Sequence, residues 1–223
     1  MSGRGHASAV SRIGGLALLS HPDVLKVDTY KDCDNVFKRW SELCPYYVWH
    51  ALAIPVPGMP GLGANSVESI WQGTKLLDGK LDLEQMQDRP VKRPAESLRN
   101  AGFKYSESRF AFGKVELDIV SARWLIYVPA YLYTLTQLVS RAIHHEIGAW
   151  LDAGKDVVFY DWDSNMDIGN PHYSFSHSSI LAQWYGRQVD DLIAGFETCA
   201  SAYDVPQKIV TPVIRRAVMC RSM

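Results

Sequence analysis

The sequence lacks the features that mark disulfide-rich and membrane-spanning proteins. Its four cysteines show no CxxC spacing and no signal peptide precedes them, so we expect reduced thiols in a cytoplasmic protein. The longest apolar run, residues 124–135, is interrupted by Pro129 and is shorter than the ~20 residues that cross a bilayer. We therefore expect no membrane association.

Several functional classes are also disfavoured. The formal net charge is -1 and the pI is near 6.6, so the chain has no overall basic field for binding phosphate backbones. The patterns GxxxxGK[ST], GxSxG and a dinucleotide-binding GxGxxG are absent. The sequence therefore does not support a kinase, a hydrolase with a nucleophile elbow or a Rossmann-type dinucleotide-binding protein. His144, His145 and Glu146 are adjacent and point in different directions on a helix, so we expect no metal site and no cofactor.

The composition is that of an ordinary globular protein. Hydrophobic residues make up 47% of the 223 residues and charged residues 21%, which is typical of a single full-sized domain. We expect a flexible N-terminus over residues 1–12 and one globular domain over residues 13–223. Helical patterns outnumber strand patterns, without a regular βαβ rhythm, so the expected fold is a compact, mainly helical α+β domain.

Periodicity, prolines and glycines predict the individual elements. Pro129 is expected to end one helix and to start a longer one. A last helix begins near Ser178 and is interrupted by Gly186. The expected helices are 35–43, 81–87, 95–101, 116–128, 129–153 and 178–202, and the expected strands are 24–27, 47–54, 157–160 and 208–218.

A helix after the glycine-rich stretch at Gly61 carries the most distinctive pattern. Asn65 is the expected N-cap, and Glu68 completes the spacing of a capping box. An apolar stripe runs along one face of this helix and includes Trp71. A second stripe consists of Glu68, Gln72 and Lys75, at spacings of four and three residues. This polar stripe either forms a solvated face or lines a pocket.

A second candidate position follows the expected strand 157–160. That apolar run leads directly into Asp161 and Trp162. Strands that end in acids and continue into polar loops commonly present side chains for binding or catalysis.

The motif Ser66-Val67-Glu68-x-x-Trp71-Gln72-Gly73-x-Lys75 resembles the S-V-E-x-x-Y-Q-A-x-K helix of the NADAR family, the YbiA-like N-glycosidases that act on ADP-ribose and riboflavin-pathway compounds. Weaker similarities follow in the same order over residues 45–190, at 88–93, 120–124 and 155–162. The segment 44–47 and the end of this range depart from the family's L-S-N-F-Y-like and closing patterns.

The resemblance implies cleavage of an N-glycosidic bond through an oxocarbenium-like transition state. Glu68 is then the carboxylate that stabilises the positive charge or activates water, and Asp161 is its partner. Aromatic rings would stack on the departing base, an amide would read its edge and cations would neutralise a phosphate. The residues predicted for these roles are Trp71, Trp124 and Trp162 for stacking, Gln72 for the base edge, and Lys75, Arg89 and Arg93 for the phosphate.

The implied substrate is a nucleotide or an ADP-ribosyl small molecule, or an ADP-ribosylated nucleic acid, and the sequence specifies no oligomeric state. One alternative is a non-catalytic protein that binds and sequesters a nucleotide or ADP-ribose, which the departures in the flanking motifs favour. A third interpretation is an unrelated helical adaptor, in which the polar stripe is a solvated surface.

Overall fold

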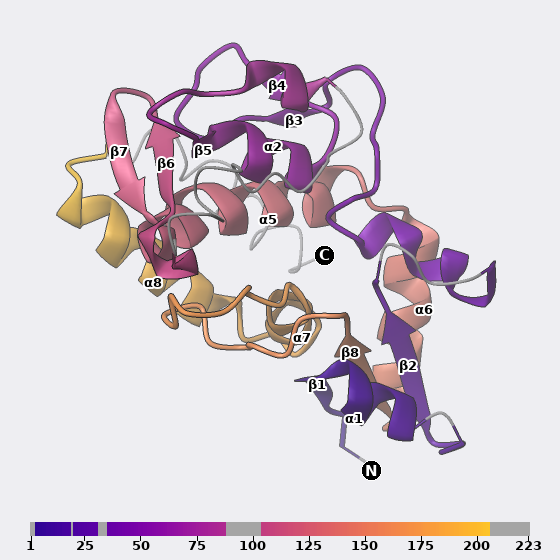
Figure 1. The fold of residues 1–223 in the computed structure, drawn as a ribbon. Helices are drawn as coiled ribbons and strands as arrows, with labels where there is room; N and C mark the ends of the chain where they lie inside the picture. The colour runs from indigo at the N-terminus through magenta and orange to yellow at the C-terminus, as the bar shows by residue number, and fades with distance from the viewer. Residues whose placement is uncertain (1–2, 19, 31–34, 88–103, 206–223) are drawn as a thin grey trace. The chain divides into compact units, whose positions relative to one another are not determined.

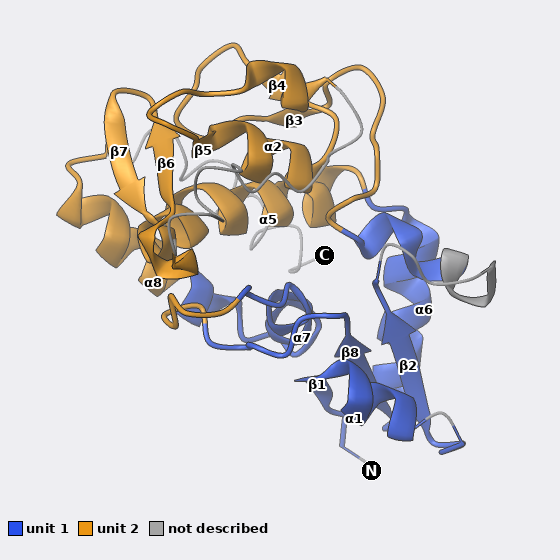
Figure 2. Cartoon of the chain, in the orientation of Figure 1, with its two compact units in different colours: residues 1–44, 139–167, 174–192 blue, residues 45–138, 168–173, 193–223 orange. Residues whose placement is uncertain are grey.

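A computed structural model describes residues 3–18, 20–30, 35–87 and 104–205 of the chain. The chain divides into two compact units, coloured blue and orange in Figure 2. Unit 1 consists of residues 1–44, 139–167 and 174–192, and unit 2 consists of residues 45–138, 168–173 and 193–223. Helices and several small sheets confirm the predicted α+β class. A single domain over residues 13–223 stays a prediction.

Unit 1 is built on a three-stranded parallel sheet. Its strands are β1 (Ala7–Val10), β2 (Val24–Asp28) and β8 (Asp156–Tyr160), and β8 lies in the middle (Figure 1). Residues 157, 159 and 160 of β8 are fully buried, as expected of a central parallel strand with both faces covered. Because the three strands are parallel, their carboxyl ends lie at the same edge of the sheet.

Helices cover this sheet. The helices α1 (Arg12–Ala17), α6 (Arg141–Asp152) and α7 (Ser178–Tyr185) pack on β8, and the 3-10 helix η1 (Asn35–Leu43) packs on β2. A Cβ atom added to Gly15 of α1 would lie 2.3 Å from the ring of Tyr160. The absence of a side chain at Gly15 is therefore what lets α1 lie directly against the central strand.

Unit 2 combines helices with two small antiparallel sheets. Its main helices are α2 (Val67–Thr74) and α5 (Val128–Gln137), which contact each other. Short helical turns are η2 (Leu83–Met86), η3 (Tyr105–Glu107), α4 (Ile119–Ala122) and the π-helical turn η4 (Arg123–Tyr127). The sheets are β3 (Ile54–Pro55) with β4 (Gly63–Ala64), and β5 (Lys75–Leu76), β6 (Arg109–Phe112) and β7 (Val115–Asp118). The helix α8 (Val189–Ala202) begins in unit 1 and continues into unit 2.

Several predicted elements are confirmed. The strands expected at 24–27 and 157–160 correspond to β2 and β8. The last helix is present as α7 and α8, separated at Gly186 as expected. The predicted helix 95–101 and strand 208–218 lie outside the described residues.

Two N-terminal predictions differ from the structure. Residues 7–10, placed in a flexible terminus, form β1, because their backbone pairs with β8 from Ala7 opposite Val157 onward. The expected strand 47–54 is reduced to Ile54–Pro55. Ala51 and Leu52 adopt φ values of 64° and 52°, and this left-handed backbone cannot continue an extended strand.

The predicted boundaries around Pro129 are also wrong. Residues 116–118 belong to β7, which forms a hairpin with β6, so the helical segment starts at Ile119 after Asp118 as N-cap. Pro129 lies in the first turn of α5, immediately after the π-helical turn, and does not end the helical run. The expected helix 129–153 is instead divided between α5 and α6 around residues 138–140.

No helix within the described ranges has both the length and the apolar character needed to cross a membrane.

Candidate functional site

The start of α2 differs from the predicted capping box in a way that bears on Glu68. Ser66 is the N-cap, and its hydroxyl oxygen accepts a hydrogen bond from the backbone N–H of Ser69 at 2.9 Å. Asn65 instead accepts a hydrogen bond from the N–H of Leu52 and donates one to the carbonyl of Gln87. Glu68 is therefore not used as the carboxylate of a capping box.

Glu68 belongs instead to a chain of side-chain hydrogen bonds in unit 2. Its Oε1 atom accepts hydrogen bonds from the Tyr46 hydroxyl at 3.1 Å and from the Gln72 amide nitrogen at 2.6 Å. Lys75 Nζ in turn donates to Gln72 Oε1 at 3.2 Å. Glu68 is only 6% exposed, whereas Tyr46 and Lys75 are half-buried. The structure thus brings together Glu68, Gln72 and Lys75 as predicted and adds Tyr46.

An aromatic segment is attached to the same end of α2. The carbonyl of Pro45 accepts the N–H of Glu68 at 3.0 Å, and the carbonyl of Asn65 accepts the N–H of Trp49 at 2.6 Å. Between these bonds, the rings of Tyr47 and Trp49 make an edge contact with centroids 4.6 Å apart. The backbone therefore fixes this partly exposed aromatic segment at the N-terminal end of α2.

Trp71 occupies the core of unit 2. Its ring centroid lies 4.1 Å from that of Phe110 and 5.5 Å from that of Tyr127, and the residue is 7% exposed. The Trp71 ring therefore packs against other aromatic rings of the core. That it stacks on a substrate base stays a prediction.

Trp124 lies in the π-helical turn and packs against α8. A Cβ atom added to Gly195 would lie 2.3 Å from the edge of its indole. Its neighbour Arg123 is fully buried and donates to three backbone carbonyls, those of residues 168, 170 and 173, at 2.6–2.9 Å. The turn therefore fixes a loop and a helix within unit 2.

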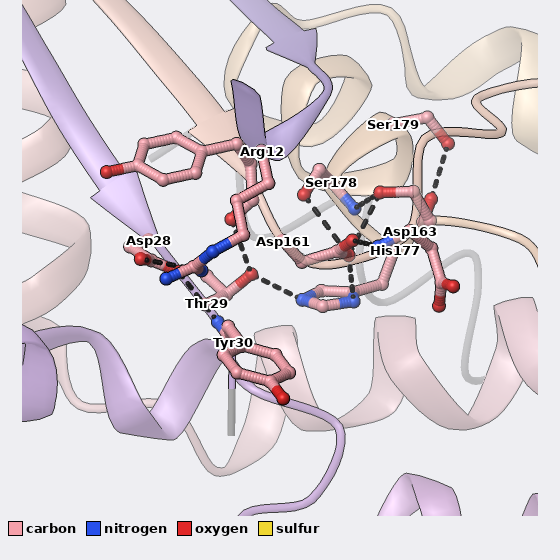
Figure 3. A network of polar contacts seen from close by, with 11 residues as sticks. Arg12, Asp28, Thr29, Tyr30, Asp161, Asp163, His177, Ser178 and Ser179 are labelled. Carbon is pink, nitrogen blue, oxygen red and sulfur yellow. Dashed lines mark hydrogen bonds and ion pairs between the residues drawn. The ribbon is translucent and has the colours of Figure 1, made fainter. Parts of the chain in front are cut away.

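Asp161 lies in unit 1, directly after the central strand β8. Its Oδ2 atom accepts a hydrogen bond from the Ser176 hydroxyl at 2.9 Å. The same atom lies 2.7 Å from Nδ1 of His177, and Figure 3 shows these two side chains facing each other. Burial raises the pKa of the Asp161 carboxyl. The opposing effects are larger, so the pKa lies below its usual value: they are the charge and hydrogen bond of His177 and the hydrogen bonds from Ser176 and the Asp163 N–H. Asp161 therefore stays ionised near neutral pH.

His177 connects this acid to the neighbouring strand. Its Nε2 atom lies 2.5 Å from Oγ1 of Thr29, the residue that follows β2 (Figure 3). The order carboxylate, imidazole, hydroxyl is that of a hydrolase triad. Thr29 is only 1% exposed and His177 only 6%, so the hydroxyl is closed to a substrate, and the chain acts as an internal brace between β2 and β8.

Asp28 and Arg12 complete the polar network at this edge. Both carboxylate oxygens of the fully buried Asp28 lie within 3.2 Å of Nη1 of Arg12, and the carboxylate also accepts the N–H of Tyr30 at 3.0 Å. Burial raises the pKa of Asp28 despite these bonds. The two strand-end acids of unit 1 thus have pKa values shifted in opposite directions.

Trp162 is exposed at the same edge. Its ring stacks on that of Tyr30, with centroids 5.4 Å apart and an interplanar angle of 27°, and the residue is 64% exposed. The predicted residues Asp161 and Trp162 therefore belong to unit 1, and Glu68 to unit 2. The predicted phosphate-binding residues Arg89 and Arg93 lie outside the described residues.

The residues predicted for the site do not include His177, Arg12, Asp28, Thr29 or Tyr30. A repeated pattern could have indicated them, because each of the strands β2 and β8 ends near an acid that is followed within two residues by an aromatic residue. In the described part of the chain, no three His, Cys, Asp or Glu side chains are grouped so that they could hold a metal ion.

Comparison with known proteins identifies one family. A model described as "Family of unknown function (DUF6939)" matches residues 20–181, a range that contains α2, Glu68, β8, Asp161 and His177. No curated protein and no solved structure matches the chain. Because the match covers well over half of the sequence, the chain belongs to this family of unknown function, DUF6939.

Proposed function

We propose that this protein is an N-glycosidase that hydrolyses the bond between a ribose and a nitrogenous base, in an ADP-ribose adduct or a nucleotide, and that its fold and chemistry are related to those of the NADAR family. One observation carries the proposal. Glu68 is a buried carboxylate whose Oε1 atom accepts hydrogen bonds from Tyr46 and Gln72. A site of this kind provides fixed negative charge without the solvent reorganisation that a surface carboxylate would require.

The reaction needs that negative charge. When the bond between C1′ and the base nitrogen breaks, its electron pair leaves with the base and positive charge develops on the ribose. Water then adds a hydroxyl group to C1′. The proton that this water loses is transferred to the base if the base leaves as an anion, and is released to solvent if the base was cationic in the substrate and leaves neutral. In the proposed mechanism the Glu68 carboxylate stabilises the ribosyl cation or accepts the proton of the water.

The neighbours of Glu68 have supporting roles in this proposal. Tyr46 and Gln72 fix the carboxylate through their two hydrogen bonds to one of its oxygens. Lys75 orients Gln72 through its bond to Oε1 and supplies a cation for an anionic part of the substrate. Tyr46 and Gln72 are positioning residues, so their loss is expected to reduce kcat more than it changes KM.

A chromatographic assay tests the proposal. Purified protein is incubated with ADP-ribosylated guanosine, NAD or a ribosylaminopyrimidine phosphate, and both free base and released sugar are measured, with Glu68→Gln in parallel. Release of base from one substrate, lost in Glu68→Gln, supports the N-glycosidase and identifies its substrate class. If both forms retain a nucleotide and neither releases base, the result supports the alternative of a sequestering protein. If the protein neither binds a nucleotide nor releases base, both hypotheses are contradicted.

A further inference from the structure

We propose that unit 1 carries a binding site for a flat heteroaromatic ring, such as a nucleobase or a nicotinamide, on the exposed face of Trp162. The site is built from Trp162, Tyr30 and Arg12. It depends on contacts within unit 1 alone and does not rest on the function proposed for Glu68.

The register of the sheet brings the two aromatic residues together. Asp28 of β2 is paired with Tyr160 of β8. Tyr30 and Trp162 each follow the last paired residue of their strand by two positions, and the bond from the Thr29 N–H to the Tyr160 carbonyl, at 3.1 Å, joins the two strands at that end. The aromatic pair is therefore a direct consequence of the strand register.

A buried acid fixes the backbone at each aromatic residue. Asp28 accepts the N–H of Tyr30, two residues on, at 3.0 Å. Asp161 accepts the N–H of Asp163, also two residues on, at 2.6 Å, so that Trp162 lies in the middle of the turn. Both contacts are Asx-turns. Their carboxylates are in turn held by Arg12 and His177 (Figure 3).

This arrangement lowers the entropic cost of binding. A side chain whose backbone is already fixed loses less freedom when a ligand contacts it. A surface tryptophan without such support would lose more conformational freedom when it binds a ligand. The buried network thus serves to present an exposed ring in a defined position.

The ring order indicates where a ligand would add. The guanidinium carbon of Arg12 lies 4.9 Å from the ring centroid of Tyr30, and the indole of Trp162 is stacked on the same ring. Both Arg12 and Trp162 therefore contact the ring of Tyr30. Trp162 is the most exposed of these three residues, at 64%. Another flat ring would extend the series guanidinium, phenol, indole.

Titration calorimetry and ligand-observed NMR test this proposal with three probes: adenosine, the cationic ring 1-methylnicotinamide, and ribose 5-phosphate, which has no aromatic ring. We expect at least one of the two ring probes to bind wild-type protein and ribose 5-phosphate not to compete. Trp162→Ala should weaken ring binding about ten-fold or more, as expected for the loss of one stacked ring. Trp162→Phe should retain most of the wild-type affinity for the ring. Which of the two ring probes binds more tightly shows whether the site prefers a neutral or a cationic ring.

Matched variants make the result specific. Tyr173 is 66% exposed, so Tyr173→Ala removes an aromatic side chain of similar exposure and should leave ring binding unchanged. Glu68→Gln should also leave it unchanged, even if this variant abolishes base release. The proposal is overturned if neither ring probe binds wild-type protein, if Trp162→Ala binds as tightly as wild type, or if binding is lost in Glu68→Gln and kept in Trp162→Ala.

Discussion

The Nδ1 atom of His177 lies 2.7 Å from the Oδ2 atom of Asp161, at the carboxyl end of the central strand of unit 1. Both side chains are more than nine-tenths buried, so each would be costly to leave without its partner. The hydroxyl of Ser176 and the N–H of Asp163 supply further bonds to the same carboxylate. Unit 1 is therefore expected to depend on the charge of Asp161.

This dependence predicts how the stability of the protein varies with pH. The pKa of Asp161 is lower in the folded protein than its ordinary value of 3.8. Its stabilising contribution is therefore fully present above pH 3.8 and is lost as the pH falls through the lower folded-state value. Asp161→Asn should lose about 3 kcal/mol or more at neutral pH, because one partner of a buried pair is removed, and should show a weaker acid dependence below about pH 4.

Denaturant unfolding between neutral pH and about pH 3 measures this effect. Asp152 offers a matched control, because its side chain is 63% exposed and pairs with Arg4 at the surface. Asp152→Asn should change the free energy of unfolding by less than about 1 kcal/mol. An Asp161→Asn variant with wild-type stability and wild-type acid dependence would show that the pair is not a stabilising element.

Arg123 should be intolerant of a change to lysine. Its planar guanidinium donates to three carbonyls of the loop 168–173, and a lysine ammonium cannot reproduce that fork. We expect Arg123→Lys to lose about 3 kcal/mol of stability and the loop to be cleaved faster in limited proteolysis. Arg109→Lys is the control, because the bridge from Arg109 to Glu116 is exposed and 3.6 Å long. Equal behaviour of the two variants would refute a special role for Arg123.

Two helical glycines should respond oppositely to alanine. In α8, a Cβ at Gly195 would lie 2.3 Å from the indole of Trp124, whereas a Cβ at Gly148 of α6 meets nothing within 4 Å. We expect Gly195→Ala to lose about 1–3 kcal/mol through overpacking and Gly148→Ala to gain up to about 1 kcal/mol through helix propensity. Thermal unfolding with near-UV circular dichroism measures both stability and the packing of Trp124. Stabilisation by Gly195→Ala would contradict the close packing of that ring.

Local patterns were sufficient to predict some parts of this molecule. The apolar run 157–160, ending in Asp161, predicts both β8 and the acid that follows it. Helical spacing predicts that Glu68, Gln72 and Lys75 lie on one side of α2, where they form a hydrogen-bonded chain. These features depend on residues within a few positions of one another, so the sequence contains the information directly.

Other parts depend on distant residues. Thr29 and His177 are 148 positions apart, and they meet because β2 pairs with β8 and α7, which His177 caps, packs on β8. Residues 116–118 fit a helical pattern but form a strand because β6 is available for pairing. At the start of α2, adjacent Asn65 and Ser66 are both good caps by residue type, and the tertiary bonds of Asn65 leave Ser66 as the N-cap.

The most direct test of the proposed N-glycosidase compares wild-type protein with Glu68→Gln, with kcat and the dissociation constant measured for the same substrate. Glutamine preserves the size of the side chain and removes its charge. Glu84→Gln, at an exposed position, controls for a general effect of losing one acid. We expect kcat to fall by about a hundred-fold or more in Glu68→Gln, with the dissociation constant changed only a few-fold. Undiminished base release by Glu68→Gln would contradict the proposed role of Glu68.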